Sequence, residues 1–102
     1  IGTAEEMAKR RGLDEEHVMQ LIANGAVGEA FGYYFNAQGE VVYSTASVGI
    51  RMEDLAKIPL VVGVGGGKSK AWAVLSVIRL GFCHVCITDE GAARKVIQIL
   101  KK

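Results

Sequence analysis

The sequence predicts an α/β fold in which helices flank an open, mostly parallel sheet that also carries a β-hairpin, with residues 1–102 in one domain. Three observations predict it. Two apolar runs, at residues 60–64 and 82–87, flank a helical pattern, as in a right-handed βαβ unit. An alternating aromatic segment is followed by a turn and a second apolar segment, as in a hairpin. Half of the 102 residues are hydrophobic and 23% are charged, which is typical of a folded chain with a modest core.

Composition also limits the function. The formal net charge of +1 provides no overall field that would draw the chain to nucleic acid. No apolar run approaches the roughly 18 residues of a membrane span, so we expect no membrane partner. The two cysteines lie close together in a long apolar stretch, which indicates reduced, buried thiols in a cytoplasmic protein.

The first helix has a recognisable start and end. Thr3 and Glu6 have the spacing of a capping box, in which each side chain bonds a backbone N–H at the helix start. The helix is expected to run to about Arg11 and to stop at Gly12. The residues before it resemble the end of a strand, so we expect the chain to be the latter part of something longer.

A second helix is expected to begin at Asp14, whose carboxylate can accept hydrogen bonds from the first free amides. The two glutamates after it suit the positive end of the helix dipole. Gly25 is expected to end this helix. Its apolar stripe is Val18, Leu21 and Ile22.

The chain then changes to a strand pattern. Residues 28–35 are predicted as one strand, because aromatic residues alternate along it. Residues 36–39 have the composition of a turn, and residues 40–43 form the return strand of a hairpin. Residues 44–58 are a connector with one short helix.

The second half of the chain predicts the βαβ unit. The short helix of the connector covers about residues 52–57, and a β-branched strand follows at 60–64. Such a continuous apolar run is typical of a parallel strand covered on both faces, and we expect the same of residues 82–87. The helix between these strands has the apolar residues Ala71, Val74, Leu75 and Ile78.

A last helix is expected after the second of these strands. Thr88 is expected to cap it, with acidic residues in its first turn. Its predicted inner stripe is Ala93, Val96, Ile97 and Leu100.

The loop after residue 64 raises the question of a ligand. It contains Gly65, Gly66 and Gly67, and Lys68 and Lys70 lie at the start of the next helix. Uncovered amides at a helix N-terminus attract anions, and ligands in open α/β sheets lie at this edge. Each lysine opposes the helix dipole by about 0.3–1 kcal/mol unless an anion is bound. The pattern predicts an anion site; solvated lysines on an exposed turn are the alternative.

Three classes of anion are compatible with the loop to different extents. A nucleoside-triphosphate loop would need a glycine where the chain has Val62, so the loop is one residue short. The dinucleotide fingerprint is met by Gly63 and Gly65, but Lys68 takes the place of the third glycine. A phosphorylated sugar held by amides and one lysine requires no rigid spacing, so the pattern permits it without singling it out.

Three stretches of the chain resemble the effector-binding domain of SorC/DeoR-type sugar-responsive transcription regulators. They are "GEAFGYYFNAQGEVV", "SVGIRMEDLAKIPLVVGVGGGKSKAWAVLSVIRLGF" and "CITDEGAARKVI". The resemblance covers about residues 1–100. It implies a fold like that of phosphosugar isomerases and glucosamine-6-phosphate deaminases. Because the family's effector domain is longer than this chain, the resemblance also implies that residues 1–102 are the C-terminal part of such a domain.

The resemblance also implies a function. The domain would bind a phosphorylated sugar, fructose-1,6-bisphosphate or a similar glycolytic phosphosugar, and would perform no net reaction and use no cofactor. A helix-turn-helix domain that binds DNA would precede this chain. The protein would be a homo-oligomeric repressor whose operator binding the sugar modulates.

Particular residues match the family pattern. By the resemblance, Lys70, directly before an alanine, contacts the ligand, and Lys68 is secondary. Glu29 stands where the family commonly has aspartate; it would reach a sugar hydroxyl, or it is only a polar residue at a strand entry. Arg10, at a helix end near the same edge, suits a second phosphate, and Arg11 could substitute for it. A basic residue facing water is the alternative for Arg10.

Two other functions are alternatives to this one. An isomerase or deaminase on the same fold would need a general base, and Glu29 is the candidate. A nucleotide-binding dehydrogenase domain is the other alternative. No metal is expected, because His84 and Cys86 share one strand face while Cys83 points the other way, and two ligands do not make a zinc site.

Overall fold

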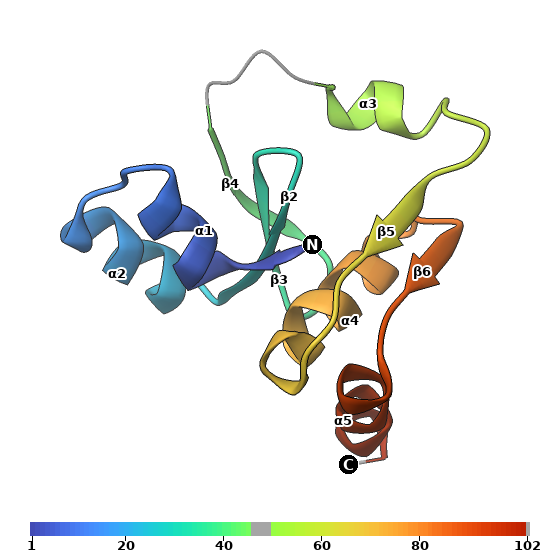
Figure 1. The fold of residues 1–102 in the computed structure, drawn as a ribbon. Helices are drawn as coiled ribbons and strands as arrows, with labels where there is room; N and C mark the ends of the chain where they lie inside the picture. The colour runs from blue at the N-terminus through green and yellow to red at the C-terminus, as the bar shows by residue number, and fades with distance from the viewer. Residues whose placement is uncertain (46–49, 102) are drawn as a thin grey trace.

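The computed structural model describes residues 1–45 and 50–101 and shows an α/β domain with two small sheets (Figure 1). Antiparallel strands form the first sheet in the order β1–β2–β3–β4, and two parallel strands form the second. The strands are β1 (Gly2–Thr3), β2 (Ala26–Ala30), β3 (Tyr33–Asn36), β4 (Val41–Ser44), β5 (Val62–Val64) and β6 (Val85–Ile87). The helices are α1 (Ala4–Arg10), α2 (Glu15–Ala23), α3 (Met52–Leu55), the 3-10 turn η1 (Lys68–Lys70), α4 (Ala71–Leu80) and α5 (Glu90–Leu100).

The α/β class and the βαβ unit are confirmed, since β5 and β6 pair in parallel with α4 between them in the chain. The expected single, mostly parallel sheet is wrong for the described residues. The larger sheet is antiparallel throughout, because β1 adds to β2 and two hairpins follow. The two sheets meet at the start of the chain, where the Ile1 nitrogen donates a hydrogen bond to the Val64 carbonyl (3.0 Å). Figure 1 shows this end of the chain at the centre of the molecule.

The predicted strand at residues 28–35 is interrupted by a tight turn. Ala30 and Tyr33 pair across β2 and β3, and Phe31 and Gly32 between them have φ of +59° and +86°. Two positive φ values are typical of a type I′ hairpin turn, which usually has Asn, Asp or Gly at its first central position. The alternation of aromatic residues gave no signal for this turn, because the first central position of the turn is occupied by an aromatic residue, Phe31.

The ends of the first two helices agree with the sequence prediction. The Thr3 hydroxyl accepts a hydrogen bond from the backbone of Glu6 at the start of α1, and Asp14 accepts one from the backbone of His17 at the start of α2. Glycines with positive φ, Gly12 and Gly25, follow the two helices. The short helix of the connector is confirmed as α3, while residues 46–49 of that connector lie outside the described residues.

Two cores hold the domain together. Helices α1 and α2 cover the first sheet over a cluster of buried residues: Ala4, Ala8, Val18, Leu21, Ala26 and Tyr34. Helix α4 packs against α5 over a second cluster: Ala71, Val74, Leu75 and Val96. Helix α4 also packs closely on β2 at Gly28, where an added Cβ would lie only 2.9 Å from Ala73 Cα. This packing places the start of α4 near β2. Among the described residues, no helix is long and apolar enough to cross a membrane.

Strands β5 and β6 are not covered on both faces. Val62, Val64, Val85 and Ile87 are each about half exposed, because no described residue packs over that face of the two-stranded sheet. The expectation of two fully buried strands is therefore wrong within residues 1–45 and 50–101.

Helix α5 differs from the prediction in its cap and its inner face. Asp89, not Thr88, is its N-cap, and the Asp89 carboxylate accepts a hydrogen bond from the backbone of Ala92 (2.9 Å). The inner face runs through Ala92 and Val96, while Ile97 and Leu100 of the predicted stripe are exposed. The start of the helix is one residue later than predicted, and the buried face follows from its packing on α4.

Candidate functional site

A polar cavity of about 320 Å³ lies where the start of the chain, helix α1, the end of β2 and the start of α4 meet. It brings together three of the predicted ligand residues, Arg10, Glu29 and Lys70, from three separate parts of the chain. Arg11 also lines it. The remaining lining residues are Ile1, Gly2, Glu6, Met7, Ala30 and Phe31. The cavity therefore combines three cationic side chains with two carboxylates and an apolar wall.

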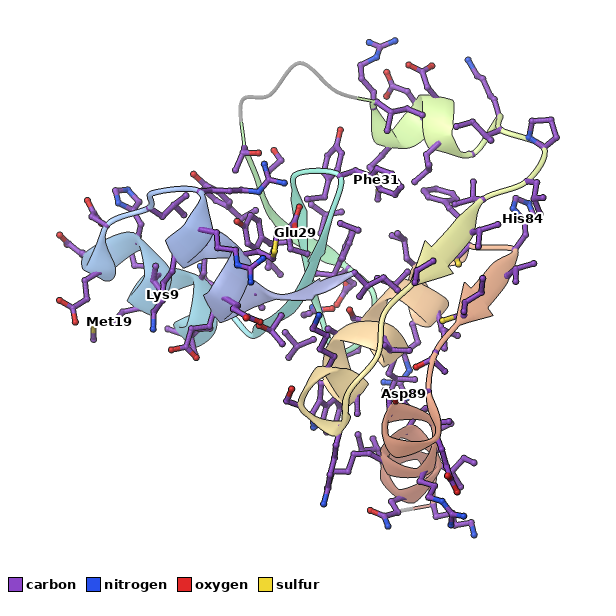
Figure 2. All side chains as sticks on the ribbon, in the orientation of Figure 1. Lys9, Met19, Glu29, Phe31, His84 and Asp89 are labelled. Atoms are coloured by element: carbon purple, nitrogen blue, oxygen red, sulfur yellow. The ribbon has the colours of Figure 1, made fainter. Side chains whose placement is uncertain are left out.

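Glu29 is the buried carboxylate of this cavity (Figure 2). It lies on β2 with its side chain only 4% exposed. Its Oε1 accepts hydrogen bonds from Arg11 Nη2 (3.1 Å) and from the backbone N–H of Gly32 (2.8 Å). A charged group buried in this way needs such partners, and these two bonds hold Glu29 in place. Among the described residues none donates to Oε2, so that oxygen can accept from a ligand hydroxyl.

The two arginines at the end of α1 have different partners. Arg10 pairs with Glu6 one turn earlier (3.6 Å) and its side chain is 71% exposed, whereas Arg11 pairs with the buried Glu29. The sequence prediction names Arg10 as the ligand for a second phosphate and Arg11 as its substitute. The structure places both at the cavity, with Arg11 in the ordered contact. Sequence spacing gave no signal for this contact, because it joins residues 18 positions apart.

Lys70 is the cation from the other side of the cavity. Its backbone N–H donates to the Gly67 carbonyl (2.9 Å), which fixes the residue at the end of η1 and the start of α4. Within the described part of the chain, neither Lys70 nor Lys68 has a carboxylate within ion-pair distance. Lys68 does not line the cavity. Of the two lysines, only Lys70 therefore lines the cavity that also contains Arg10 and Arg11.

The glycine loop itself contacts the rest of the chain. Gly67 N–H donates to Asp89 Oδ2 (2.8 Å), and Gly65 N–H donates to the Ile87 carbonyl (3.0 Å). A Cβ at Gly66 would lie 2.9 Å from Asp89 Oδ2, and one at Gly65 would lie 3.0 Å from Cβ of Ile1. Close packing therefore accounts for these two glycines (Asp89 is labelled in Figure 2). Ligand binding by Gly65, Gly66, Gly67 and Lys68 stays a prediction, since none of them lines the cavity.

The remaining candidates for chemistry have structural partners. His84 Nδ1 accepts a hydrogen bond from the Val61 backbone (2.9 Å), and the Cys83 thiol donates to the Val85 carbonyl (3.0 Å). Burial raises the pKa of the Cys86 thiol. Residues 1–45 and 50–101 contain no group of three or more His, Cys, Asp or Glu side chains that could hold a metal ion.

Comparison with known families identifies the class of protein. A family model described as "Putative sugar-binding domain" matches residues 1–98. The chain belongs to this family, the sugar-binding domain of SorC/DeoR-type regulators, and the resemblance in its sequence is thereby confirmed. The cavity that contains Arg10, Arg11, Lys70 and Glu29 is of the size and polarity of a small-molecule site.

Curated relatives show which kinds of transcription regulator the chain is similar to. The chain is 46% identical over 98 residues to the central glycolytic genes regulator of Bacillus subtilis. This alignment covers 96% of this chain and 29% of that protein. It is 35% identical over 78 residues to the transcriptional regulator LsrR of Escherichia coli K12, covering 72% of this chain and 25% of that protein. The chain thus spans between a quarter and three tenths of the length of the curated relatives it matches. These relatives are named as regulators and not as enzymes.

Solved structures agree with the fold. A structure described as a "putative SorC family transcriptional regulator" from Enterococcus faecalis has a TM-score of 0.85 and 37% identity, over 94% of this chain and 39% of that one. A DeoR family transcriptional regulator from Listeria monocytogenes has a TM-score of 0.72 and 28% identity, over 87% of this chain and 38% of that one. Both similarities cover most of this chain and less than half of the solved chain.

Proposed function

We propose that this chain is the C-terminal part of the effector-binding domain of a transcriptional repressor, and that its polar cavity binds a phosphorylated sugar. The observation that carries the proposal is the convergence of Arg10, Arg11 and Lys70 on one cavity that also contains the buried carboxylate of Glu29. The cavity volume lies near the lower end of the range for small-molecule sites, about 300–1,000 Å³. Membership of the sugar-binding family supports the ligand class.

Each polar side chain has a definite role in this proposal. Lys70, which has no ion-pair partner among the described residues, bonds a phosphate oxygen. Arg10 exchanges its exposed pair with Glu6 for a phosphate, at small cost because exposed pairs contribute little. Glu29 accepts a hydrogen bond from a sugar hydroxyl at Oε2. Arg11 holds Glu29 in position and adds positive charge near the ligand.

We further propose that the ligand is fructose-1,6-bisphosphate or a similar glycolytic phosphosugar. The support is the 46% identity to a relative named as a regulator of central glycolytic genes. A helix-turn-helix domain that precedes this chain would bind the operator DNA. The whole repressor would be a homo-oligomer in the cytoplasm. The sugar would change DNA affinity by favouring one of two arrangements of that oligomer, because it binds one arrangement more tightly than the other.

Calorimetric titration of the full-length protein with a panel of phosphosugars tests the proposal. Lys70→Ala is expected to weaken binding by about tenfold or more, since a hydrogen bond to a charged group contributes about 1.5–3 kcal/mol. Lys68→Ala is the matched control, because it removes the same charge two residues away and outside the cavity. Equal losses in the two variants, or no loss in Lys70→Ala, would contradict the assignment of the cavity.

A further inference from the structure

Phe31 has an unusual backbone conformation for its residue type. Its φ of +59° is the only positive φ of a non-glycine residue in the described part of the chain. The first central position of a type I′ turn favours Asn, Asp or Gly, because a bulky side chain there is strained. The Phe31 ring is also half exposed, so burial in a core does not explain it. A strained residue that persists in this way indicates a function for its side chain.

The position of the ring suggests what that function is. Figure 2 shows Phe31 at the tip of the β2–β3 hairpin, beyond Glu29. It lines the polar cavity that contains Arg10 and Lys70, and it also lines an adjoining apolar cavity of about 80 Å³. Glu29 holds the turn in place, because its Oε1 accepts a hydrogen bond from the backbone N–H of Gly32 (2.8 Å). The buried carboxylate of Glu29 therefore bonds both to Arg11 and to the turn that carries Phe31.

We propose that Phe31 is a specificity-determining residue, whose ring packs against the carbon skeleton of a phosphorylated organic ligand. This inference rests on the proposed function of the cavity. The cationic side chains can bind any phosphate, because they recognise charge and oxygen atoms. The ring adds an apolar surface that only a ligand with C–H groups can cover, and covering it removes apolar area from water. Phe31 therefore makes the site prefer a phosphosugar to an inorganic phosphate.

Substitution at residue 31 of the full-length protein tests the inference with two probes, fructose-1,6-bisphosphate and inorganic pyrophosphate. Phe31→Asn removes the ring and suits the turn, so the variant is expected to unfold at the same temperature as the wild type or a higher one. It is expected to bind fructose-1,6-bisphosphate about tenfold more weakly and pyrophosphate within about twofold of the wild type. Phe31→Tyr keeps the ring and is expected to bind both probes like the wild type.

The outcomes separate this inference from the proposed function. If the wild-type protein binds fructose-1,6-bisphosphate and Phe31→Asn binds it equally well, the role of Phe31 is wrong while the proposed function stands. If Phe31→Asn loses affinity for both probes to the same extent, the ring shapes the cavity without selecting the ligand, and the inference is also wrong. If the wild type binds neither probe, both proposals fail.

Discussion

Substitution of Gly28 by alanine tests how the fold positions the site. Gly28 lies on β2 next to Glu29, and helix α4, which begins directly after Lys70, packs on it. An added Cβ would lie 2.8 Å from Ser76 Oγ and 2.9 Å from Ala73 Cα. The hydroxyl oxygen belongs to a fully buried residue, and the second contact is helix backbone, so neither can move alone.

The size of the effect follows from this geometry. For an ordinary contact, Ala73 Cα must retreat from 2.9 Å to at least 3.4 Å, which shifts helix α4 as a unit. Overpacking of this kind costs about 1–3 kcal/mol, and each kcal/mol lowers the melting temperature by about 4–8 °C for a domain of roughly 100 residues and by about 2–4 °C for one of about 150–250 residues. We expect Gly28→Ala to lose stability to that extent in thermal unfolding followed by circular dichroism. Affinity for fructose-1,6-bisphosphate is expected to fall as well, because Lys70 moves away from Glu29.

A matched glycine controls for the change itself. Gly91 lies in α5, and a Cβ there would have only ordinary contacts, the nearest at 3.7 Å. Gly91→Ala is therefore expected to leave stability unchanged or to raise it by up to about 1 kcal/mol through helix propensity. A Gly28→Ala variant as stable as the wild type would refute the close packing of α4 on β2, and with it the reason Lys70 and Glu29 share a cavity.

Two further predictions concern the helix caps. The pKa of Asp14 is lowered, first by the hydrogen bond from the His17 backbone, so its cap stabilises the fold above the ordinary aspartate pKa and is lost as the pH falls through the lowered value. Asp14→Asn should retain a cap but lose this contribution to acid sensitivity, as measured by melting temperatures between about pH 6 and pH 2. Asp89→Ala removes the N-cap of α5 and the acceptor of the Gly67 amide. We expect a loss of about 1 kcal/mol, with faster hydrogen exchange at Gly67; unchanged exchange would contradict the observed contact.

Local signals in the sequence were sufficient for much of the fold. The caps at Thr3 and Asp14 were predictable because their hydrogen bonds reach only three residues along the chain. The parallel pairing of β5 and β6 was predictable because two apolar runs flank a helical pattern. The turn at Phe31 was not, since its backbone conformation contradicts the preference of the residue that adopts it.

The site was predictable only in part for a related reason. Glu29, Arg10 and Lys70 were named from the family pattern and from helix ends, and the structure brings them to one cavity. The contact of Arg11 with Glu29 depends on how α1 lies over the first sheet, which no local pattern encodes. The hydrogen bond from the Gly67 backbone to Asp89 joins residues 22 positions apart. It could not be predicted either, because no local pattern in the sequence encodes a contact at that separation.

The location of the ligand is the most direct test of the central claim. A crystal structure of the full-length protein with fructose-1,6-bisphosphate is expected to show a phosphate group within hydrogen-bond distance of Lys70 Nζ and an arginine at the end of α1, with the sugar beside Glu29. A phosphate bound instead at the amides of residues 65–67, with the carboxylate of Asp89 displaced and the cavity empty of ligand, would contradict it.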